Sequence, residues 1–476
     1  MGKSRVFDAR SRMPVSATEL FAWHTREGAF ERLTPPWETM EVLERHGEGI
    51  REGAKAVMRM RLGPVPRKWV ARHTQYVEGS LFQDEQESGP FARWVHTHRM
   101  VPESPSSSSM EDVVEYTLPL GLLGQGVGGG FARRTLERMF SYRHSVLRAD
   151  LRRHAAFAEQ GPLTVAVSGA TGLVGRALVP FLTAGGHRVR RLVRGRPEAA
   201  RGDVAWNPAQ GEIDAAALEG VDAVVHLAGE NVAQRWTPEA QDRIRRSRTE
   251  GTRVVCEALA RLKRKPRVLV SASAVGFYGD RGEALLTEAS DSGEGFLASV
   301  VRDWEAAAAP ALDAGIRVVH LRIGLVLDAS GGALAKMVPA FLLGGGGRVG
   351  SGQQWVSWIA LEDVLGLAHF ALMKPELRGP VNAVAPHAVR QEEFARSLGR
   401  VLSRPSVFPL PAVAVRTVFG QLGQEALLAG AHVLPEVAQR QGFSFLFPEL
   451  EEALRFTLGR TTAGAQFMHG LAAKVP

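Results

Sequence analysis

The sequence predicts an α/β protein in which a doubly wound parallel sheet is preceded by a separate α+β unit and followed by a small helical unit. From Leu163 onward, short apolar runs of strand length alternate with helical stretches, which is typical of a parallel sheet covered on both faces. Residues 1–160 instead contain short runs in which apolar and polar residues alternate, as in half-buried antiparallel strands. At 476 residues the chain is too long for one typical core.

The changes of pattern predict the domain boundaries. We expect one unit over residues 1–160, a second over 163–403, a third over 404–460 and a mobile tail over 461–476. The net charge of +8 arises from 58 basic and 50 acidic residues that are interspersed along the chain. Because no compact basic run stands out, no nucleic-acid partner is predicted.

Cysteine content and hydropathy bear on the compartment. The chain has a single cysteine, Cys256, which lies among apolar neighbours and is expected to act as a small buried hydrophobe. We recognise no signal peptide and no apolar run long enough to span a bilayer, so no membrane span is predicted and the cytoplasm is the expected location. The oligomeric state is left open.

The first unit opens with an amphipathic segment over residues 17–33, closed by Pro35-Pro36. Several β-like runs follow, over residues 38–46, 54–62, 68–78, 80–88, 92–101 and 110–118. Residues 104–109 (SPSSSS) are expected to form a turn or mobile loop. A glycine-rich hinge is expected from Leu122 to Gly130, followed by one long helix over residues 131–160.

Two histidines of this unit share a strand face with Trp94. His96 and His98 stand two residues apart in a predicted strand, so their side chains point the same way. They could be ligand or metal groups, but solvated or core-edge histidines are commoner, and no metal site is predicted.

A glycine motif organises the second unit. Residues 163–175 read LTVAVSGATGLVG and continue into a helical pattern, so a strand, a glycine turn and a helix follow one another. Gly169 allows a tight turn, Gly172 lets the backbone approach a pyrophosphate, and Gly175 lets the helix pack closely on the strand. The free N–H groups at the helix N-terminus favour phosphate, so this stretch predicts a dinucleotide site of the Rossmann type.

The end of the second strand indicates which dinucleotide binds. An acidic residue there would hold the ribose of NAD, whereas arginine accepts the 2′-phosphate of NADP. This strand ends in Arg194 and Arg196, and the first acid is Glu198. NADP(H) is therefore favoured over NAD(H), although both arginines could simply face solvent.

Several motifs together resemble a known family. They are SGATGLVGRAL, VVHLAGENV, SASAVGFYGD, LRIGLVLDASGGAL and GSGQQWVSWIALEDV. They are similar to the extended short-chain dehydrogenase/reductases, and more narrowly to the atypical NAD(P)-dependent epimerase-like branch, whose members carry a short C-terminal domain. The resemblance covers about Leu163 to Phe456. The first unit resembles the helix-grip, START-like polyketide cyclase and lipid-transfer superfamily, which implies a cavity for an apolar ligand. Some fused members of the branch are labelled cell-division inhibitors.

The resemblance implies functional residues. Along the pyrophosphate it places Gly169, Thr171, Gly172, Leu173 and Val174, beside Gly175 of the motif. On the ribose side of the cofactor it places Leu227, Ala228 and Gly229. Near the nicotinamide it places Ser271 and Ser273, of which Ser273 matches the serine that orients a substrate oxygen.

One departure from the family concerns catalysis. The superfamily uses a Tyr general acid/base with a Lys four residues on, but none of the four tyrosines here is followed by such a Lys. With Glu305 aligned on the family's following acid, Leu297 and Val301 occupy the two positions. Tyr278 is the nearest candidate acid/base, equally readable as a packed loop tyrosine, and its pKa is expected to stay near 10.

These features leave three hypotheses open. The first is an NADP(H)-binding oxidoreductase or epimerase with an altered, weak site that acts on a small carbonyl or hydroxyl substrate. The second is a non-enzymatic, NADP-sensing regulatory protein that has lost the Tyr–Lys chemistry. In the third, the N-terminal unit binds an apolar ligand and presents it to the reductase.

Overall fold

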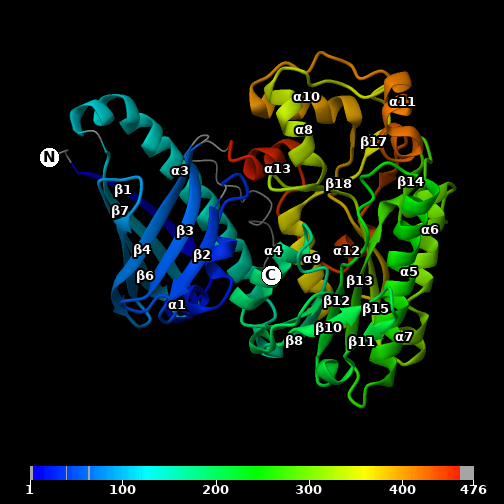
Figure 1. Cartoon of the computed structure of the whole chain (residues 1–476), viewed down its shortest axis with the longest axis horizontal. Coiled ribbons are helices and arrows are strands. Elements are labelled where there is room, and N and C mark those ends of the chain that lie inside the picture. The colour runs from blue at the N-terminus through cyan, green and yellow to red at the C-terminus, as the bar shows by residue number, and fades with distance from the viewer. Residues whose placement is uncertain (1–3, 39, 63–64, 120, 461–476) are drawn as a thin grey trace. The chain divides into compact units, whose positions relative to one another are not determined.

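The computed structural model describes residues 4–38, 40–62, 65–119 and 121–460 (Figure 1). Contacts divide the chain into two compact units. The N-terminal unit holds residues up to Gly161, with Pro180–Gly186 and a short segment that begins at Leu458. The C-terminal unit comprises Pro162–Val179 and His187–Thr457. The predicted mobile tail, 461–476, lies outside the described residues.

The N-terminal unit is built on an antiparallel sheet of seven strands in the order β1-β7-β6-β5-β4-β3-β2. The predicted β-like runs all form strands, and a strand for which we had no prediction, β1, lies at one edge. The strands are β1 Arg5–Met13, β2 Met40–His46, β3 Lys55–Leu62, β4 Val65–Val77, β5 Leu81–Ser88, β6 Arg93–Ser104 and β7 Ser107–Thr117.

Three helices accompany this sheet: α1 Ala17–Thr25, α2 Ala29–Arg32 and α3 Gly121–Ala155. The amphipathic segment forms two helices because Gly28 takes a left-handed conformation, with φ of 90°, between them. The long helix α3 then packs against β1 (Figure 1). Helix and curved sheet give the α+β arrangement that the sequence predicts.

Two predictions in this unit are wrong. The glycine hinge over Leu122–Gly130 is instead the first part of α3. Each glycine costs a helix only about 1 kcal/mol, so a helix nucleated over the following residues can propagate through them. The loop expected over Ser104–Ser109 shrinks to the turn between β6 and β7, and Ser107 to Ser109 belong to β7.

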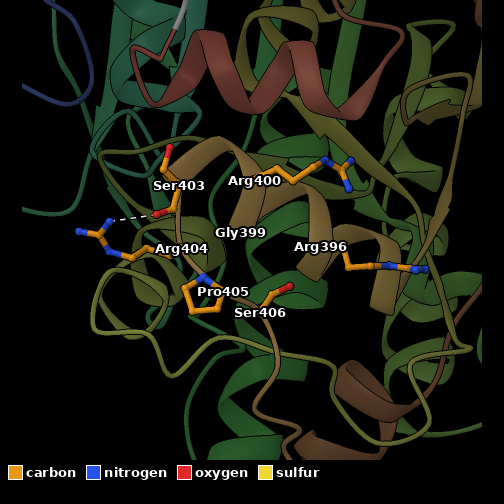
Figure 2. A pocket seen from close by; sticks show the side chains of 7 residues that line it. All are labelled: Arg396, Gly399, Arg400, Ser403, Arg404, Pro405 and Ser406. Carbon is orange, nitrogen blue, oxygen red and sulfur yellow. Dashed lines mark hydrogen bonds between the residues drawn. The ribbon is translucent and has the colours of Figure 1, made fainter.

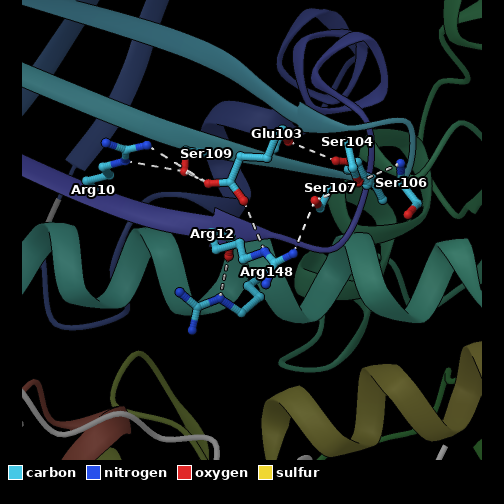
Figure 3. Close-up of polar contacts among 10 residues, drawn as sticks. Arg10, Arg12, Glu103, Ser104, Ser106, Ser107, Ser109 and Arg148 are labelled. Carbon is cyan, nitrogen blue, oxygen red and sulfur yellow. Dashed lines mark hydrogen bonds and ion pairs between the residues drawn. The ribbon is translucent and has the colours of Figure 1, made fainter.

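Hydrogen bonds explain why these serines are ordered (Figure 3). Ser107 Oγ lies 2.8 Å from Ser104 Oγ and accepts from Arg12 of β1 at 3.3 Å. Ser109 donates to Glu103 and accepts from Arg10 at 3.3 Å. Arg12 also pairs with Glu103 at 3.1 Å. The buried hydroxyls therefore have partners on both neighbouring strands.

The C-terminal unit is built on an eight-stranded sheet in the order β11-β10-β9-β8-β12-β13-β15-β19. All neighbouring pairs are parallel except β10 and β11. Its strands are β8 Thr164–Ser168, β9 Arg188–Val193, β10 Val204–Asn207, β11 Glu212–Ile213, β12 Ala223–His226, β13 Val268–Ala274, β15 Arg317–Ile323 and β19 Gly379–Ala383. The chain winds outward from β8 in both directions, so the predicted doubly wound sheet is confirmed.

Helices cover both faces of this sheet. Figure 1 shows α5, α6 and α7 gathered on one face and α9 on the other. The helices are α4 Gly175–Ala184, α5 Pro238–Arg261, α6 Phe296–Ala306, α7 Ala309–Asp313, α8 Gly332–Leu342, α9 Leu361–Met373 and α10 Gln391–Leu402. Cys256 of α5 is buried in the apolar core, as predicted, and burial raises the pKa of its thiol to about 12.

The chain beyond Arg404 forms the helices α11 Ala412–Leu422, α12 Glu436–Arg440 and α13 Leu450–Thr457. Short strand pairs complete the unit: β14 Leu285–Leu286 with β21 His432–Val433, β16 Leu325–Leu327 with β18 Trp358–Ala360, and β17 Trp355–Val356 with β20 Val389–Arg390. The pairing of β14 with β21 ties this C-terminal part to the sheet-containing part of the same unit.

Candidate functional site

The glycine turn links β8 to α4 with little space for side chains. Gly169 has φ of 68°, and a Cβ there would lie 2.8 Å from the carbonyl carbon of Leu227. A Cβ on Gly175 would lie 2.1 Å from the Gly169 oxygen. Both positions therefore require glycine, one for conformation and contact and the other for contact alone.

A hydrogen-bonded clamp holds the turn where the strand order reverses. Ser168 Oγ lies 2.7 Å from Nδ1 of His226, at the end of β12. The same oxygen accepts from the N–H groups of Leu227 at 3.1 Å and Ala228 at 3.3 Å. Burial lowers the pKa of His226 to about 4, so the ring stays neutral and accepts from the serine. The clamp brings Leu227 and Ala228 beside the glycine turn.

The outer side of the turn is open. Thr171 and Gly172 are exposed, and Leu173 and Val174 are half-buried ahead of the N-terminus of α4. Arg176 in the first turn of α4 donates to Ser330 Oγ at 2.8 Å. Free N–H groups at this helix start, next to an exposed glycine, can donate hydrogen bonds to a pyrophosphate.

The strand β9 ends at a small hollow of about 210 Å³. Arg194 is among the residues that line it and Arg196 is not, although both arginines are exposed. Glu212 of β11 and Asp214 of the following loop are also among the residues that line the hollow. Sequence reading missed these two acids because they follow a third strand.

Gly229 follows β12 and is exposed beside an arginine for which we had no prediction. A Cβ on Gly229 would lie 3.3 Å from Cζ of Arg248. Arg248 donates to the carbonyl of Ile244 at 3.0 Å, and burial lowers its pKa to about 10. Its guanidinium stays charged and stands next to the predicted ribose segment.

Ser273 begins a chain of buried polar contacts. Its Oγ donates to Glu305 of α6 at 2.6 Å, and Glu305 accepts two further bonds from Arg322 of β15, both at 2.8 Å. Arg322 also donates to the Tyr278 hydroxyl at 3.0 Å. That hydroxyl lies 2.7 Å from Oδ1 of Asn382. We call Ser273, Glu305, Arg322 and Tyr278 the serine–tyrosine chain.

Burial and hydrogen bonding together determine which side chains of this chain are ionised. Burial would raise the pKa of Glu305, but the bonds from Arg322 and Ser273 outweigh it and lower that pKa, so Glu305 is ionised. For Tyr278, burial outweighs Arg322 and raises the pKa above its usual range. The expectation of an ordinary Tyr278 pKa is therefore wrong. Tyr278 is protonated at neutral pH and is fully buried.

The other predicted positions lie around this chain. Ser271 is buried on β13, with its Oγ 3.2 Å from the Ala272 carbonyl oxygen. Leu297 and Val301 lie on α6, where Val301 is buried and Leu297 packs near Gly276. Apolar side chains thus stand where the family places Tyr and Lys.

The sequence did not predict a place in the site for Glu305 or Arg322. Glu305 lies eight residues after Leu297, on the same helical face as Leu297 and Val301. Arg322 is buried in the strand RVVHLRI, between the apolar residues Leu321 and Ile323. A buried charge requires a partner of opposite charge. The presence of Glu305 and Arg322 in buried segments could therefore have predicted that they pair.

A second hollow lies at the C-terminal end of α10 (Figure 2). It is lined by Arg396, Gly399, Arg400, Ser403, Arg404, Pro405 and Ser406. Arg400 pairs with Glu451 at 3.0 Å, and Arg404 donates to the Leu342 carbonyl at 3.1 Å. Helix C-termini disfavour anions, and all three of these guanidinium groups already have partners, since Arg396 pairs with Glu392 at 3.4 Å. This hollow is therefore a poor site for a phosphate.

The fold and the glycine turn define a dinucleotide-binding protein of the Rossmann type. The sequence matches the NAD dependent epimerase/dehydratase family over residues 165–384, a domain of unknown function over 410–457, and the polyketide cyclase / dehydrase and lipid transport family over 13–140. An epimerase family protein of Mycobacterium bovis is 43% identical over 297 residues, which cover 62% of this chain and 98% of that protein. The chain belongs to the epimerase family.

Two solved structures are similar. The nucleoside-diphosphate sugar epimerase from Corynebacterium glutamicum is 33% identical with a TM-score of 0.79, covering 98% of this chain and 92% of that one. The human epimerase family protein SDR39U1 (isoform 2), solved with NADPH, is 35% identical with a TM-score of 0.58, covering 62% of this chain and 99% of that one. The recognised family and the START-like N-terminal unit are confirmed.

Among the described residues, no helix has the length and hydropathy needed to cross a membrane. A relative from Arabidopsis thaliana, 40% identical, is named chloroplastic. The cytoplasmic location stays a prediction for this chain.

Proposed function

We propose that the C-terminal unit binds NADP(H) in preference to NAD(H) and acts slowly, as an oxidoreductase or epimerase, on a small carbonyl or hydroxyl compound. The observation that carries this proposal is the pairing of an open glycine turn with Ser273, which is held by ionised Glu305 while the Tyr–Lys positions are apolar. The cofactor supplies or accepts a hydride when it is bound. The chain itself contributes binding and orientation of the reacting oxygen.

The cofactor preference rests on Arg194 in the hollow at the end of β9. An arginine bond to the 2′-phosphate would favour NADPH by about 1.5–3 kcal/mol, or roughly ten- to a hundredfold in affinity. The NADPH-bound human relative supports this choice. The carboxylates of Glu212 and Asp214 oppose it, so the preference is expected at the lower end of that range.

Titration of NADPH and NADH into the full chain tests the preference. Arg194→Ala should remove most of the difference between the two cofactors. Arg196→Ala is the matched control, since this arginine is exposed two residues on and is not among the residues that line the hollow. Equal affinities of the wild type for NADPH and NADH would exclude the preference.

Catalysis without the Tyr–Lys pair should be slow. Positioned acid/base groups contribute about 10²–10⁴-fold in rate, and the apolar Leu297 and Val301 supply no such group. We therefore expect tight NADPH binding with slow turnover on small carbonyl substrates. Ser273→Ala should reduce that turnover about tenfold or more while cofactor affinity changes little.

Tyr278 has two roles to distinguish. As the general acid it would control the alkaline limb of the pH–rate profile, so Tyr278→Phe should abolish that limb. As a positioning residue acting through Arg322, the same change should lower the rate and leave the profile unchanged. Burial of its hydroxyl favours the positioning role.

The apolar pair Leu297 and Val301 is also compatible with the alternative of a regulatory protein. A protein that senses NADP would bind the cofactor without any turnover. Single-turnover mixing of NADPH-loaded protein with a panel of carbonyl compounds separates the two functions. Oxidation of bound NADPH supports the enzyme, whereas stable NADPH across the panel supports the sensor.

We also propose that the N-terminal unit takes an apolar ligand between its sheet and α3. Its match to the polyketide cyclase and lipid transport family supports this. Mass spectrometry of molecules that co-purify with the full chain tests it. Recovery of polar molecules only would contradict the proposal.

A further inference from the structure

Two histidines and two aspartates of the N-terminal sheet meet one histidine of α3 in a group that we call the His–Asp cluster. It consists of Asp84 of β5, His96 and His98 of β6, Asp112 of β7 and His144 of α3. The strand register sets Asp84 opposite His96, and Asp112 opposite His98. Side chains that are opposite one another in adjacent strands share a face, so the register itself assembles the cluster.

The cluster is removed from water. His96 is 4% exposed, His98 9%, Asp112 3% and His144 5%. The ring of His98 stacks on Phe82 with centroids 4.0 Å apart, and His96 meets Phe140 edge-on at 5.2 Å. Polar groups buried among aromatic rings are costly unless every donor and acceptor has a partner. Of the alternatives that the sequence left open, solvated histidines are therefore excluded, whereas core-edge and ligand histidines are not.

Asp112 satisfies one side of the cluster. It accepts from Nε2 of His96 at 2.9 Å and from Nε2 of His144 at 2.6 Å. Nδ1 of His98 lies 2.6 Å from Asp112 Oδ1, but it is too poorly aligned to form a hydrogen bond and has no other partner within the described residues. One carboxylate thus orients two rings and crowds a third.

The other side of the cluster is unsatisfied. Oδ1 of Asp84 lies 3.6 Å from Nδ1 of His96 and 3.7 Å from Nε2 of His98. A neutral histidine ring has a single N–H. Because His96 uses that N–H on Asp112, its Nδ1 directs a lone pair toward a carboxylate oxygen. Such an arrangement is repulsive unless a cation lies between them.

We propose that a divalent transition-metal ion of the Zn²⁺ type binds between Asp84, His96 and His98. One donor atom from each residue lies within 4.8 Å of the other two. Zinc bonds of 2.0–2.2 Å in a tetrahedron place neighbouring donors roughly 3.3 Å apart, so the observed spacing needs only small side-chain movements. Two imidazoles and one carboxylate are a common donor set for such ions.

Asp112 has a defined part in this site. Metal-bound histidines usually donate their second N–H to a carboxylate, which fixes the ring and its tautomer. His96 does this with Asp112. Three protein donors leave one coordination position open, as in catalytic zinc sites, for water or for an oxygen of a bound ligand.

Cobalt binding to the full chain tests the site. After treatment with a chelator, the protein is titrated with Co²⁺ and followed by visible absorption, and Zn²⁺ is then added as competitor. We expect Asp84 to be required, with Asp84→Asn weakening Co²⁺ affinity at least tenfold. Glu87→Gln on the same strand is the matched control, since Glu87 pairs with Lys55 at 2.9 Å and lies outside the cluster.

The outcomes separate a metal from a proton. Tight Co²⁺ binding that Asp84→Asn weakens and Glu87→Gln leaves intact supports the site. Equal Co²⁺ binding by the two variants overturns the proposal, and so does the absence of Co²⁺ binding by the wild type. A His98 ring that is doubly protonated at pH 8 in ¹⁵N spectra of the metal-treated protein also overturns it. If Asp84→Asn fails to fold by circular dichroism, His96→Gln replaces it in the same titration. Proton release by the wild type on Co²⁺ addition is a further requirement.

Discussion

Two buried polar sites, one in each unit, satisfy their groups in different ways. In the serine–tyrosine chain of the C-terminal unit, each of the three nitrogens of Arg322 donates, and both oxygens of Glu305 accept. In the His–Asp cluster of the N-terminal unit, a neutral imidazole has only one N–H, and Nδ1 of His96 and Nε2 of His98 lie 3.6 and 3.7 Å from Asp84 Oδ1, beyond hydrogen-bond distance. An arginine can complete a buried network alone, whereas histidines leave acceptors that call for an added cation.

The largest expected effect is on the completed network. Arg322→Met leaves ionised Glu305 buried without its partner and should lower the free energy of unfolding of the C-terminal unit by about 3–5 kcal/mol. Urea denaturation measures this loss. Arg246→Met removes an exposed pair with Glu250 and should cost less than about 1 kcal/mol. Similar losses in the two variants would mean that the chain is not a closed network.

A second variant separates charge from shape. Adding Glu305→Gln to Arg322→Met removes the unpaired charge, so the double variant should recover part of the lost stability. No recovery would indicate that packing around Arg322, including its contact with the Phe277 ring at 3.5 Å, carries the effect.

An intermediate effect is expected from acid. Burial, with the charge of His98 second, lowers the pKa of His24 in the N-terminal unit to about 4, and burial alone does so for His226 in the C-terminal unit. Unfolded histidine titrates near 6.5, so the unfolded chain binds more protons between pH 6.5 and 4. Stability should therefore be full above about pH 6.5 and should fall as the pH drops toward 4, by about 3 kcal/mol for each residue.

Urea unfolding at pH 7.5 and 4.5 measures this dependence. His226→Asn should flatten it in the C-terminal unit, because the amide oxygen can still accept from Ser168 and does not titrate. His24→Gln should flatten it in the N-terminal unit. A pH dependence unchanged in both variants would show that other groups control acid unfolding.

The smallest effect is expected to be alike in both units. Ser16 caps α1 by accepting from the Glu19 N–H at 3.2 Å, and Thr237 caps α5 by accepting from the Ala240 N–H at 3.2 Å. Ser16→Ala and Thr237→Ala should each cost about 1 kcal/mol. Thermal unfolding measures both, and a large difference between them would show that capping depends on the unit rather than on the local bond.

Much of the fold follows from local pattern. The half-buried strands have alternating apolar and polar residues, and the buried strands have continuous apolar runs. The glycine turn is recognisable because Gly169 and Gly175 are required by contacts within and beside the turn itself. The edge strand β1 was missed because its residue types do not follow its regular alternation of burial: Val6 is exposed and Ser11 is half-buried. The prediction of a hinge was wrong because glycines only lower the helix propensity of a segment. A long helix that follows the segment can still extend through it.

The candidate site was less predictable because its contacts join distant positions. The bonds from Ser273 to Glu305 and from Arg322 to Tyr278 depend on how β13, α6 and β15 meet. The acid Asp214 reaches the hollow beside Arg194 through a third strand. His96 and His98 were visible in sequence, but their burial and the opposing Asp84 appear only once strand register is known.

The position of β1 also bears on how the protein is made. The strands β2 to β7 neighbour one another in the order in which they are synthesised, so each hairpin can form as it leaves the ribosome. The strand β1 emerges first, yet its partner is β7, and Arg5 pairs with Tyr116 more than a hundred residues later. Closing so long a loop is slow, and β1 must wait unpaired during translation. Its many charged side chains, including Arg10 and Arg12, would keep this early strand from pairing with other nascent chains.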